Sequence, residues 1–248
     1  MPYITEYSEI GPKELRQLSY KRRFKQEVPA WDDSMELLKN ELAKRLVSKS
    51  SVLDAGCVHG NYIIDELRDK FSSAIGIDIA PEVMNKNVCL DKTVVGNIES
   101  LPFENNLFDL VTSLWVFEHI ECPQKVFTEI ARVLKPGGYF ALCTPNKKSI
   151  LIALRRMMND TIAKYLVKKT YGREENDTFR VYYKTNTIKD ITRLAKENKF
   201  EIEVLTENTD PSYTAFNTVT YILSKWFSLL PFSLSKHHII AILKKKII

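Results

Sequence analysis

The sequence is poor in cysteine, and its cysteines are far apart. Four occur among 248 residues, and no two form a Cys-x-x-Cys pair: Cys57, Cys89, Cys122 and Cys143. This scatter argues against a disulfide-stapled scaffold and against a zinc site of the usual spacing, so we predict no metal. Such cysteine usage is typical of a reducing compartment, and we expect the protein in the cytoplasm.

Long apolar runs are also missing. Residues 213–234 are rich in large apolar side chains but are interrupted by Asn217, Lys225 and Pro231. They therefore lack the stretch of about 20 apolar residues that a transmembrane helix needs. The first residues show no basic region followed by an apolar stretch, so we expect no signal peptide. Contact with a membrane surface stays open as an interpretation.

Acidic residues are scarce in one stretch of the chain. The formal net charge is only +5, but residues 147–173 carry eight Lys or Arg residues against a single acid, Asp160. A second basic cluster, residues 244–246, lies near the end. Either these are solvated faces, or they attract phosphate groups of a substrate, nucleic acid or membrane.

What the sequence has is an alternation of short β-branched runs with helical patterns between Ser51 and Thr144. This alternation predicts parallel βαβ units and an α/β sheet. The expected strands are Ser51–Ala55, Ala74–Ile79, Thr93–Val95, Phe108–Leu114 and Gly138–Thr144. The expected helices are Tyr62–Phe71, Pro81–Asn87 and Pro123–Leu134, the last stopped by Lys135-Pro-Gly-Gly.

Three segments flank or interrupt this pattern. Residues 1–48 form an N-terminal flap and a lead-in helix (Ser34–Val47), and residues 147–178 and 213–234 are insertions, the first of them an amphipathic helical lid. A capped helix from Thr187 to about Asn198 and strands Glu201–Thr206 and His237–Leu243 complete the pattern. We interpret residues 1–248 as a single domain in which the insertions enclose a substrate.

The residues that carry chemistry follow the first strand. Gly56 and Gly60 let the backbone approach a ligand closely, because neither carries a Cβ. Asp54 ends the preceding strand and supplies an acceptor. Asp78 ends the next strand, at the place where an acid accepts hydrogen bonds from ribose hydroxyls. Together these residues predict an adenosine site.

A dinucleotide-binding dehydrogenase uses a similar turn, but the spacing here argues against one. Its fingerprint is Gly-x-Gly-x-x-Gly, which cradles a pyrophosphate. After Gly56, this chain has Val58 and Asn61 at the second and third glycine positions.

The order of motifs resembles one family. Val52-Leu-Asp-Ala-Gly56 is followed by Gly96-Asn97-Ile98 with Leu101-Pro-Phe103, then by Phe108-Asp109 through Glu118-His119, and finally by Ala131-Arg-Val-Leu-Lys-Pro-Gly-Gly-Tyr139. This series is similar to the class I S-adenosylmethionine-dependent methyltransferases, especially the small bacterial branch acting on quinone precursors, sugars and other metabolites. The resemblance implies a Rossmann-like three-layer sandwich with a seven-stranded, mostly parallel sheet and an antiparallel last strand.

The resemblance also implies residue roles, with S-adenosyl-L-methionine as cofactor. It places Asp54, Gly56 and Gly60 around the methionine part, and Asp78 on the ribose. Four further residues have roles at the adenine or the sulfonium: Ile79 packs on adenine, Asn97 and Ile98 lie at its edge, and the Leu114 backbone lies near the sulfonium. The chain departs from the family at Val58, where glycine is usual, and at Asn97, where aspartate is frequent.

His119 is the candidate catalytic residue if the acceptor is a hydroxyl, because it follows the fourth strand at the same edge and can act as a general base. The alternative is that Glu118 and His119 simply begin a helix. His59 is a weaker candidate, Cys57 is expected to be a buried thiol, and His237 and His238 are expected to pack at the start of a strand.

These observations predict a methyltransferase acting on a small or lipid-linked metabolite, with oxygen methylation favoured. Apolar and aromatic residues of the insertions suit an organic acceptor, and basic residues suit its phosphate or carboxylate groups. Two alternatives stay open. A binding or scaffold protein would follow if Val58, whose β-branch disfavours positive φ, spoils the cofactor site. A nucleic-acid methyltransferase is less favoured, because no base-flipping signature follows the fourth strand.

Overall fold

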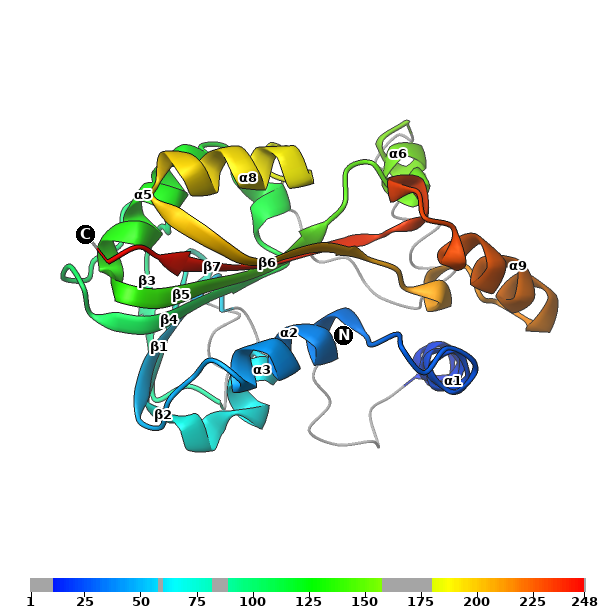
Figure 1. Ribbon diagram of the computed structural model, residues 1–248, viewed down its shortest axis with the longest axis horizontal. Helices are drawn as coiled ribbons and strands as arrows, with labels where there is room; N and C mark the ends of the chain where they lie inside the picture. The colour runs from blue at the N-terminus through cyan, green and yellow to red at the C-terminus, as the bar shows by residue number, and fades with distance from the viewer. Residues whose placement is uncertain (1–10, 58–59, 82–88, 158–179, 248) are drawn as a thin grey trace. The chain divides into compact units, whose positions relative to one another are not determined.

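The computed structural model describes residues 11–57, 60–81, 89–157 and 180–247. The described helices are α1 (Pro12–Glu27), α2 (Ser34–Ala43), α3 (Tyr62–Glu66), α5 (Pro123–Val133), α6 (Ile150–Met157), α8 (Ile188–Glu197) and α9 (Thr218–Leu229) (Figure 1). Short 3-10 helices are η2 (Arg68–Lys70), η3 (Phe117–His119), η4 (Pro211–Tyr213) and η5 (Ser233–Ser235). The strands are β1 (Ser50–Ala55), β2 (Phe71–Asp78), β3 (Lys92–Val95), β4 (Phe108–Leu114), β5 (Leu134–Pro145), β6 (Phe200–Asn208) and β7 (His238–Lys245).

The chain divides into two compact units. The sheet unit comprises Met35–Pro145, Val181–Thr206 and Ile239–Ile248. The helical unit comprises the described parts of Met1–Ser34, Asn146–Arg180 and Glu207–His238. The helical unit thus collects the described parts of both insertions and of residues 1–34, whereas the lead-in helix α2 belongs, apart from Ser34, to the sheet unit. Their role in enclosing a substrate within one domain stays a prediction.

The strands form one seven-stranded sheet in the order β3-β2-β1-β4-β5-β7-β6, which confirms the predicted class of fold. The pairs β1–β2, β1–β4, β2–β3 and β4–β5 are parallel. The last strand, β7, is antiparallel to β6. The Lys246 amide donates to the Lys199 carbonyl and the His237 amide to the Asn208 carbonyl, so the residue numbers of β6 and β7 run in opposite directions.

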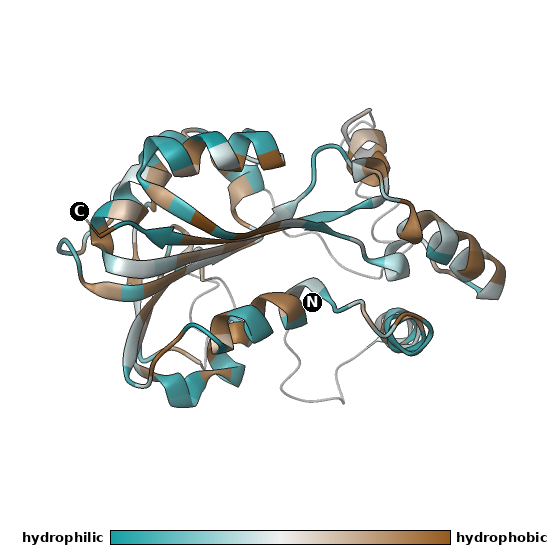
Figure 2. Cartoon of the chain, viewed as in Figure 1, coloured by the Kyte–Doolittle hydropathy of each residue, from teal (hydrophilic) through white to brown (hydrophobic). Residues whose placement is uncertain are grey.

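Helices cover both faces of the sheet unit. Neighbouring residues of each strand point to opposite faces, so Leu53 packs in one apolar cluster with α5 and α8, whereas Val52 packs in the other with α2 and α3. The central strands accordingly carry apolar side chains on both faces, and brown residues occur along them in Figure 2. This is the predicted three-layer sandwich.

Several predicted boundaries shift. β2 ends at Asp78, so Ile79 lies outside the strand. The predicted helix Tyr62–Phe71 ends at Glu66 and is followed by a 3-10 turn, and the lead-in helix ends at Ala43. α5 stops at Val133 as expected, but β5 starts at once, because Leu134 pairs with Phe108. The helix predicted at Pro81–Asn87 and most of the lid after Met157 lie outside the described residues.

The strand order places one edge of the sheet at a topological switch point. β1 connects towards β2 on one side and has β4 on its other side, so the order reverses between β1 and β4. In open α/β sheets, ligands bind outside the carboxyl ends of the strands at this point. We call the carboxyl ends of β1, β2 and β4, with the turns that follow them, the carboxyl edge.

The helical unit has its own small core, in which α1 contacts α9. Tyr20 stacks on Tyr221 with ring centroids 5.1 Å apart, and Phe24 meets Trp31 edge to face. The buried ring of Tyr221 also donates its hydroxyl hydrogen to Glu27 at 3.0 Å. An aromatic cluster therefore joins the N-terminal segment to the segment around residue 220.

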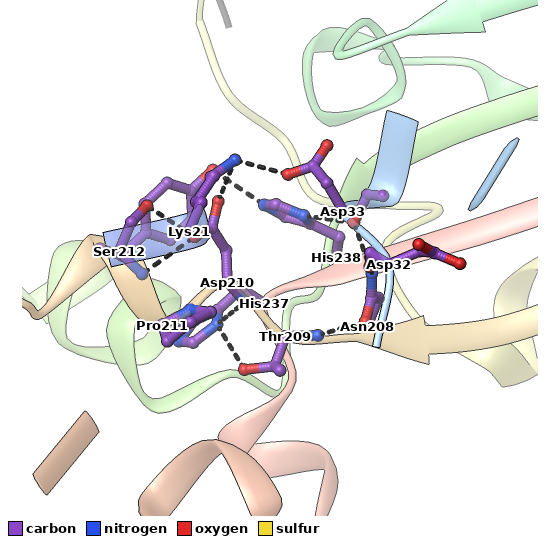
Figure 3. A network of polar contacts seen from close by, with 12 residues as sticks. Lys21, Asp32, Asp33, Asn208, Thr209, Asp210, Pro211, Ser212, His237 and His238 are labelled. Carbon is purple, nitrogen blue, oxygen red and sulfur yellow. Dashed lines mark hydrogen bonds and ion pairs between the residues drawn. The ribbon is translucent and has the colours of Figure 1, made fainter. Parts of the chain in front are cut away.

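A buried ion cluster holds the same two segments (Figure 3). The Lys21 ammonium lies 2.5 Å from Asp33 Oδ2 and 2.7 Å from Asp210 Oδ2. Burial by itself lowers the pKa of Lys21, but the two carboxylates reverse this effect and raise it. Asp210 is almost fully buried and also accepts two hydrogen bonds from Ser212, at the amide and the hydroxyl.

The two histidines of this region are structural, as predicted. His238 is bonded on both ring nitrogens, to the Ser34 hydroxyl at Nδ1 and to the Tyr213 hydroxyl at Nε2, each at 2.8 Å. His237 Nδ1 accepts a hydrogen bond from the Asp210 amide at 3.1 Å. Burial lowers the pKa of His237 to about 4 and that of His238 to about 3, so both rings are neutral at physiological pH.

We predict that Lys21→Met destabilises the protein by about 3 kcal/mol or more, because Asp33 and Asp210 then lose the cation that compensates their burial. Urea unfolding followed by tryptophan fluorescence measures the loss. The matched control is Lys25→Met, whose half-exposed ammonium pairs with Asp32 and contributes no more than about 1 kcal/mol. Equal losses for the two variants would contradict the assignment.

Candidate functional site

The glycine turn after β1 is tied to the end of β2. The amides of Gly56 and Cys57 both donate to the Ile77 carbonyl, at 2.8 and 3.2 Å. Gly56 has φ of +88°, and a Cβ there would lie 2.3 Å from Val116 Cγ2. Gly60 has φ of +136°, but a Cβ there would meet only Cys89 Sγ at 3.8 Å. Gly56 is thus required by contact as well as by backbone conformation, and Gly60 by conformation alone.

Val58 and His59 lie outside the described residues. The effect of Val58 on a ligand and the role of His59 therefore stay predictions.

Asp54 is the last residue but one of β1 and connects three elements. Its Oδ1 accepts hydrogen bonds from Asn61 Nδ2 at 2.8 Å and from the Thr112 hydroxyl at 2.9 Å. Asn61 is the N-cap of α3, where its Oδ1 accepts from the amides of Ile63 and Ile64. Thr112 belongs to β4. One carboxylate thus joins β1, β4 and the start of the first helix.

The electrostatic environment of Asp54 is unusual. Its side chain is buried, and this burial raises its pKa from 3.8 to about 6, with a smaller contribution from the charge of Asp78. The hydrogen bonds from Asn61 and Thr112 act in the opposite direction but do not cancel the effect of burial. Asp54 therefore changes charge just below physiological pH, as groups at functional sites often do.

Asp78 and Ile79 lie at the neighbouring strand end. The Asp78 side chain is only 8% exposed, and its Oδ1 accepts from the Ala80 amide at 3.0 Å. The next side chain, Ile79, is 57% exposed. The pair thus presents a carboxylate beside an uncovered apolar side chain.

Asn97 and Ile98 follow β3, whose end is bound to the Asp78 carbonyl through the Gly96 amide at 2.9 Å. Asn97 is exposed, and its Oδ1 accepts from the Glu99 amide at 2.8 Å, which closes a local turn. The Ile98 side chain is buried in the core beside α5, so its contribution to a ligand would come from its backbone.

Leu114 ends β4 with a partly buried side chain. It precedes Trp115, which has φ of +59° and donates its amide hydrogen to the Cys143 carbonyl at 2.9 Å. This left-handed residue turns the chain away from the sheet into η3.

His119 is the last residue of η3 and is partly buried. The expectation that Glu118 and His119 start a helix is met only by this single 3-10 turn, and the longer helix α5 begins at Pro123. His119 therefore follows β4 at the carboxyl edge, as predicted, and its role as a base stays a prediction.

A polar cluster around Glu118 was not predicted from the sequence. This carboxylate is only 7% exposed, and its Oε2 accepts from the Thr144 hydroxyl at 3.1 Å. Thr144 in turn accepts from Asn186 Nδ2 at 2.6 Å, and the amide of Tyr182 donates to the Glu118 carbonyl at 2.7 Å. Two buried oxygens, Oδ1 of Asn186 and Oγ1 of the neighbouring Thr185, have no hydrogen-bond partner among the residues that the structure describes. The one local signal was an acid within the apolar stretch after β4.

The cysteines of the edge are not activated. Cys57 is almost completely buried, and burial raises its pKa to about 12; burial also raises the pKa of Cys89. A thiol with a raised pKa is a poor nucleophile, in agreement with the prediction of a buried, unreactive Cys57. Within the described ranges, no three His, Cys, Asp or Glu residues lie close enough to hold a metal.

The carboxylates and the apolar side chain at the carboxyl edge suit one kind of ligand. Asp54 and Asp78 lie at the ends of adjacent strands and offer carboxylate acceptors, Ile79 offers an apolar surface, and Gly60 adds no side chain beside the turn. A molecule with hydroxyl and ammonium donors on an apolar ring system matches these features. The residues therefore fit S-adenosyl-L-methionine, and the role of each single residue stays a prediction.

Comparison with known proteins supports this interpretation. Residues 53–142 match a family described as "Methyltransferase domain". The chain is 32% identical over 120 residues to the sterol 4-C-methyltransferase strm-1 of Caenorhabditis elegans, covering 44% of this chain and 36% of that protein. It is 32% identical over 130 residues to a ubiquinone biosynthesis O-methyltransferase of Xanthomonas oryzae, covering 48% and 53%. The chain thus spans about half or less of these relatives' length.

Solved structures show the same fold over more of the chain. An S-adenosylmethionine-dependent methyltransferase from Mesorhizobium loti aligns with a TM-score of 0.60 and 14% identity, covering 85% of this chain and 96% of that one. At this identity the likeness concerns the fold alone. Residues 53–142 thus match a methyltransferase domain, and the chain has the fold of an S-adenosylmethionine-dependent methyltransferase; together with the motif order, both findings support a class I methyltransferase.

Proposed function

We propose that this chain transfers a methyl group from S-adenosyl-L-methionine to an oxygen of a small or lipid-linked metabolite. The observation that carries the proposal is the pair of buried carboxylates, Asp54 and Asp78, at the ends of adjacent strands beside the glycine turn. A relative named as an O-methyltransferase supports the choice of oxygen. The four free cysteines favour a reducing compartment, and we place the protein in the cytoplasm.

The carboxyl edge would hold the cofactor by complementary groups. Asp78 would accept hydrogen bonds from the ribose hydroxyls, and Ile79 would pack on the adenine ring. Asn97 and the Ile98 backbone would lie at the edge of that ring. Asp54, Gly56 and Gly60 would surround the methionine part, where the Asp54 charge attracts an ammonium group. The Leu114 backbone would lie near the sulfonium.

When bound, S-adenosyl-L-methionine supplies an electrophilic methyl group on its sulfonium. The residues of the chain contribute alignment of an acceptor and exclusion of water, which are the main protein contributions to such a displacement. A hydroxyl acceptor must also lose its proton. His119 is the residue that we assign to this step, and the buried Glu118 beside it would orient the acceptor through the cluster with Thr144 and Asn186.

Calorimetric titration with S-adenosyl-L-methionine tests the cofactor site. We expect micromolar binding and a loss of roughly a hundredfold in affinity for Asp78→Ala, because two hydrogen bonds to a carboxylate disappear. The control is Asp69→Ala, an exposed aspartate just before the other end of β2. If the wild-type protein shows no binding, the proposed enzyme is wrong and a scaffold role takes its place.

A pH series tests Asp54. Its carboxyl group takes up a proton as the pH falls through about 6, so the attraction for the cofactor's ammonium declines. We expect cofactor affinity to fall by up to about tenfold per pH unit below that value, and Asp54→Asn to remove this dependence while binding weakly throughout. Titrations of both proteins across this range measure it, and parallel slopes would contradict the assignment.

The stability of the ligand-free protein should move in the opposite direction. A carboxyl group with a raised pKa is harder to ionise in the folded state, so Asp54 lowers the free energy of unfolding as the pH rises from about 4 to about 6. Asp54→Asn keeps an acceptor for Asn61 and Thr112 without the buried charge. It should therefore be more stable than wild type at neutral pH by up to about 3 kcal/mol, and equally stable below pH 4. Urea unfolding at both pH values measures this difference.

Turnover by His119→Ala tests the base. With a hydroxyl acceptor found by screening quinone precursors, sugar nucleotides and lipid-linked intermediates, kcat should fall by about 10²-fold or more while cofactor affinity stays constant. Glu118→Gln, which retains the hydrogen-bonding shape, serves as the comparison. An unchanged kcat in His119→Ala together with a large loss in Glu118→Gln would move the role of base to Glu118.

A further inference from the structure

Helix α9 points its polar side chains inward and its apolar side chains outward. The buried residues of this helix are Tyr221, Ser224 and Ser228. Five large apolar side chains are exposed on the remaining faces: Val219, Ile222, Leu223, Trp226 and Leu229. A helix on the surface of a water-soluble domain normally shows the reverse arrangement.

Hydrogen bonds fix this orientation. The Tyr221 hydroxyl donates to Glu27 at 3.0 Å, the Ser224 hydroxyl to the Pro211 carbonyl at 2.8 Å, and Ser228 accepts from the Thr209 hydroxyl at 3.0 Å. Turning α9 to bury its apolar side would leave these polar groups unpaired. The apolar residues therefore remain outside, and Trp226 and Leu223 are each 65% exposed.

The apolar surface continues beyond α9. After the helix, Leu230, Phe232 and Leu234 are exposed as well, the last two by more than half. Helix α6 lies next to α9, because Ile150 and Leu151 line one open cavity of about 350 Å³ together with Leu223 and Phe227. Three apolar side chains of α6 are exposed as well: Ile150, Leu154 and Met157. Both helices are mostly brown or pale in Figure 2. We call the exposed apolar residues of 150–157 and 219–234 the α6–α9 surface.

The charges of these segments have one sign. Neither residues 147–157 nor residues 211–238 contain an aspartate or a glutamate. Lys147, Lys148, Arg155 and Arg156 precede or belong to α6, and Lys225 and Lys236 accompany α9. The Lys148 side chain is exposed, whereas the Lys225 ammonium pairs with Glu27 at 2.8 Å. A partner must therefore combine an apolar interior with negative charge at its surface.

An anionic lipid bilayer has this combination, and a second copy of the chain does not. In a symmetric dimer the same patch lies on both sides of the interface, which would bring basic residues against basic residues. A bilayer instead offers hydrocarbon beneath a layer of anionic headgroups, and tryptophan favours the boundary between the two. None of the helices in the described ranges is long and apolar enough to cross a membrane. The matching geometry is a helix lying in the plane of the interface.

We propose that the α6–α9 surface docks the protein on anionic membranes, with Leu223, Trp226 and Phe232 inserted below the headgroups and the basic residues among the phosphates. The proposal concerns the helical unit alone and does not depend on methyl transfer. It adds to the proposed function a location at which a lipid-linked acceptor would be met.

Sedimentation with vesicles tests the docking. Wild-type protein should pellet with vesicles made of equal parts phosphatidylcholine and phosphatidylglycerol, much less with phosphatidylcholine alone, and less as salt rises. Leu223→Ser combined with Trp226→Ser should lower the partition coefficient at least tenfold, because two apolar side chains no longer leave water. Val47→Ser is the matched control, since Val47 is 71% exposed but belongs to the sheet unit.

Folding and function are controlled separately. Both substituted residues are mostly exposed, so the urea midpoint of the double variant should equal that of wild type. Asp78→Ala should still bind vesicles as wild type does, whatever its affinity for the cofactor. The proposal is overturned if wild-type protein stays in the supernatant, or if the double variant pellets as wild type does. It is also overturned if light scattering shows a dimer that the double substitution dissociates while vesicle binding is absent.

Discussion

The buried carboxylate of Asp54 is the interaction on which the carboxyl edge depends. Its Oδ1 joins the end of β1 to Thr112 of β4 and to Asn61, which caps α3. The same bonds fix where the glycine turn leaves the sheet and where the first helix begins. Because burial makes ionisation of Asp54 costly, its charged form is unfavourable in the ligand-free protein, and a cationic ligand would stabilise it. The charge of Asp54 thus lowers the free energy of unfolding of the ligand-free protein and raises the affinity for a cationic ligand.

The layers of the sheet unit were predictable from sequence because their signals are local. Leu53 and Val52 are adjacent and both apolar, which indicates a strand buried on both faces. The start of α8 is likewise indicated by a four-residue pattern, in which the N-cap Thr187 is followed three residues later by Asp190. The sequence also predicted where the polar residues of the carboxyl edge lie, namely Asp54, Gly56 and Asp78. Each stands at or just after the end of a parallel strand, and these ends meet at one edge of the sheet. The predicted ends of strands and helices were less accurate. For example, β5 begins at Leu134 and not at Gly138, because Leu134 pairs with Phe108.

The polar clusters were not predictable, because each joins residues far apart in the chain. Glu118 lies in η3, Thr144 in β5 and Asn186 in the loop before α8, and none carries a motif of its own. Lys21 looks like one of several basic residues on a solvated helix, and only folding brings it between Asp33 and Asp210. Hydropathy predicts that polar and charged residues such as these are exposed. In the structure each of them is buried together with an ion-pair or hydrogen-bond partner, which is the condition under which a polar or charged group can enter a protein interior.

Helix α9 shows why hydropathy alone gives the wrong inward face. Its apolar residues outnumber the polar ones, so a pattern-based orientation would bury Leu223 and Trp226. In the structure, three hydrogen bonds to Glu27, Pro211 and Thr209 select the opposite face, since each buried polar group left unpaired costs about as much as one apolar side chain gains. Water does not favour the resulting apolar surface. A chain that keeps such a surface beside basic residues, without an acid in either segment, is suited to a partner that is itself apolar and negatively charged.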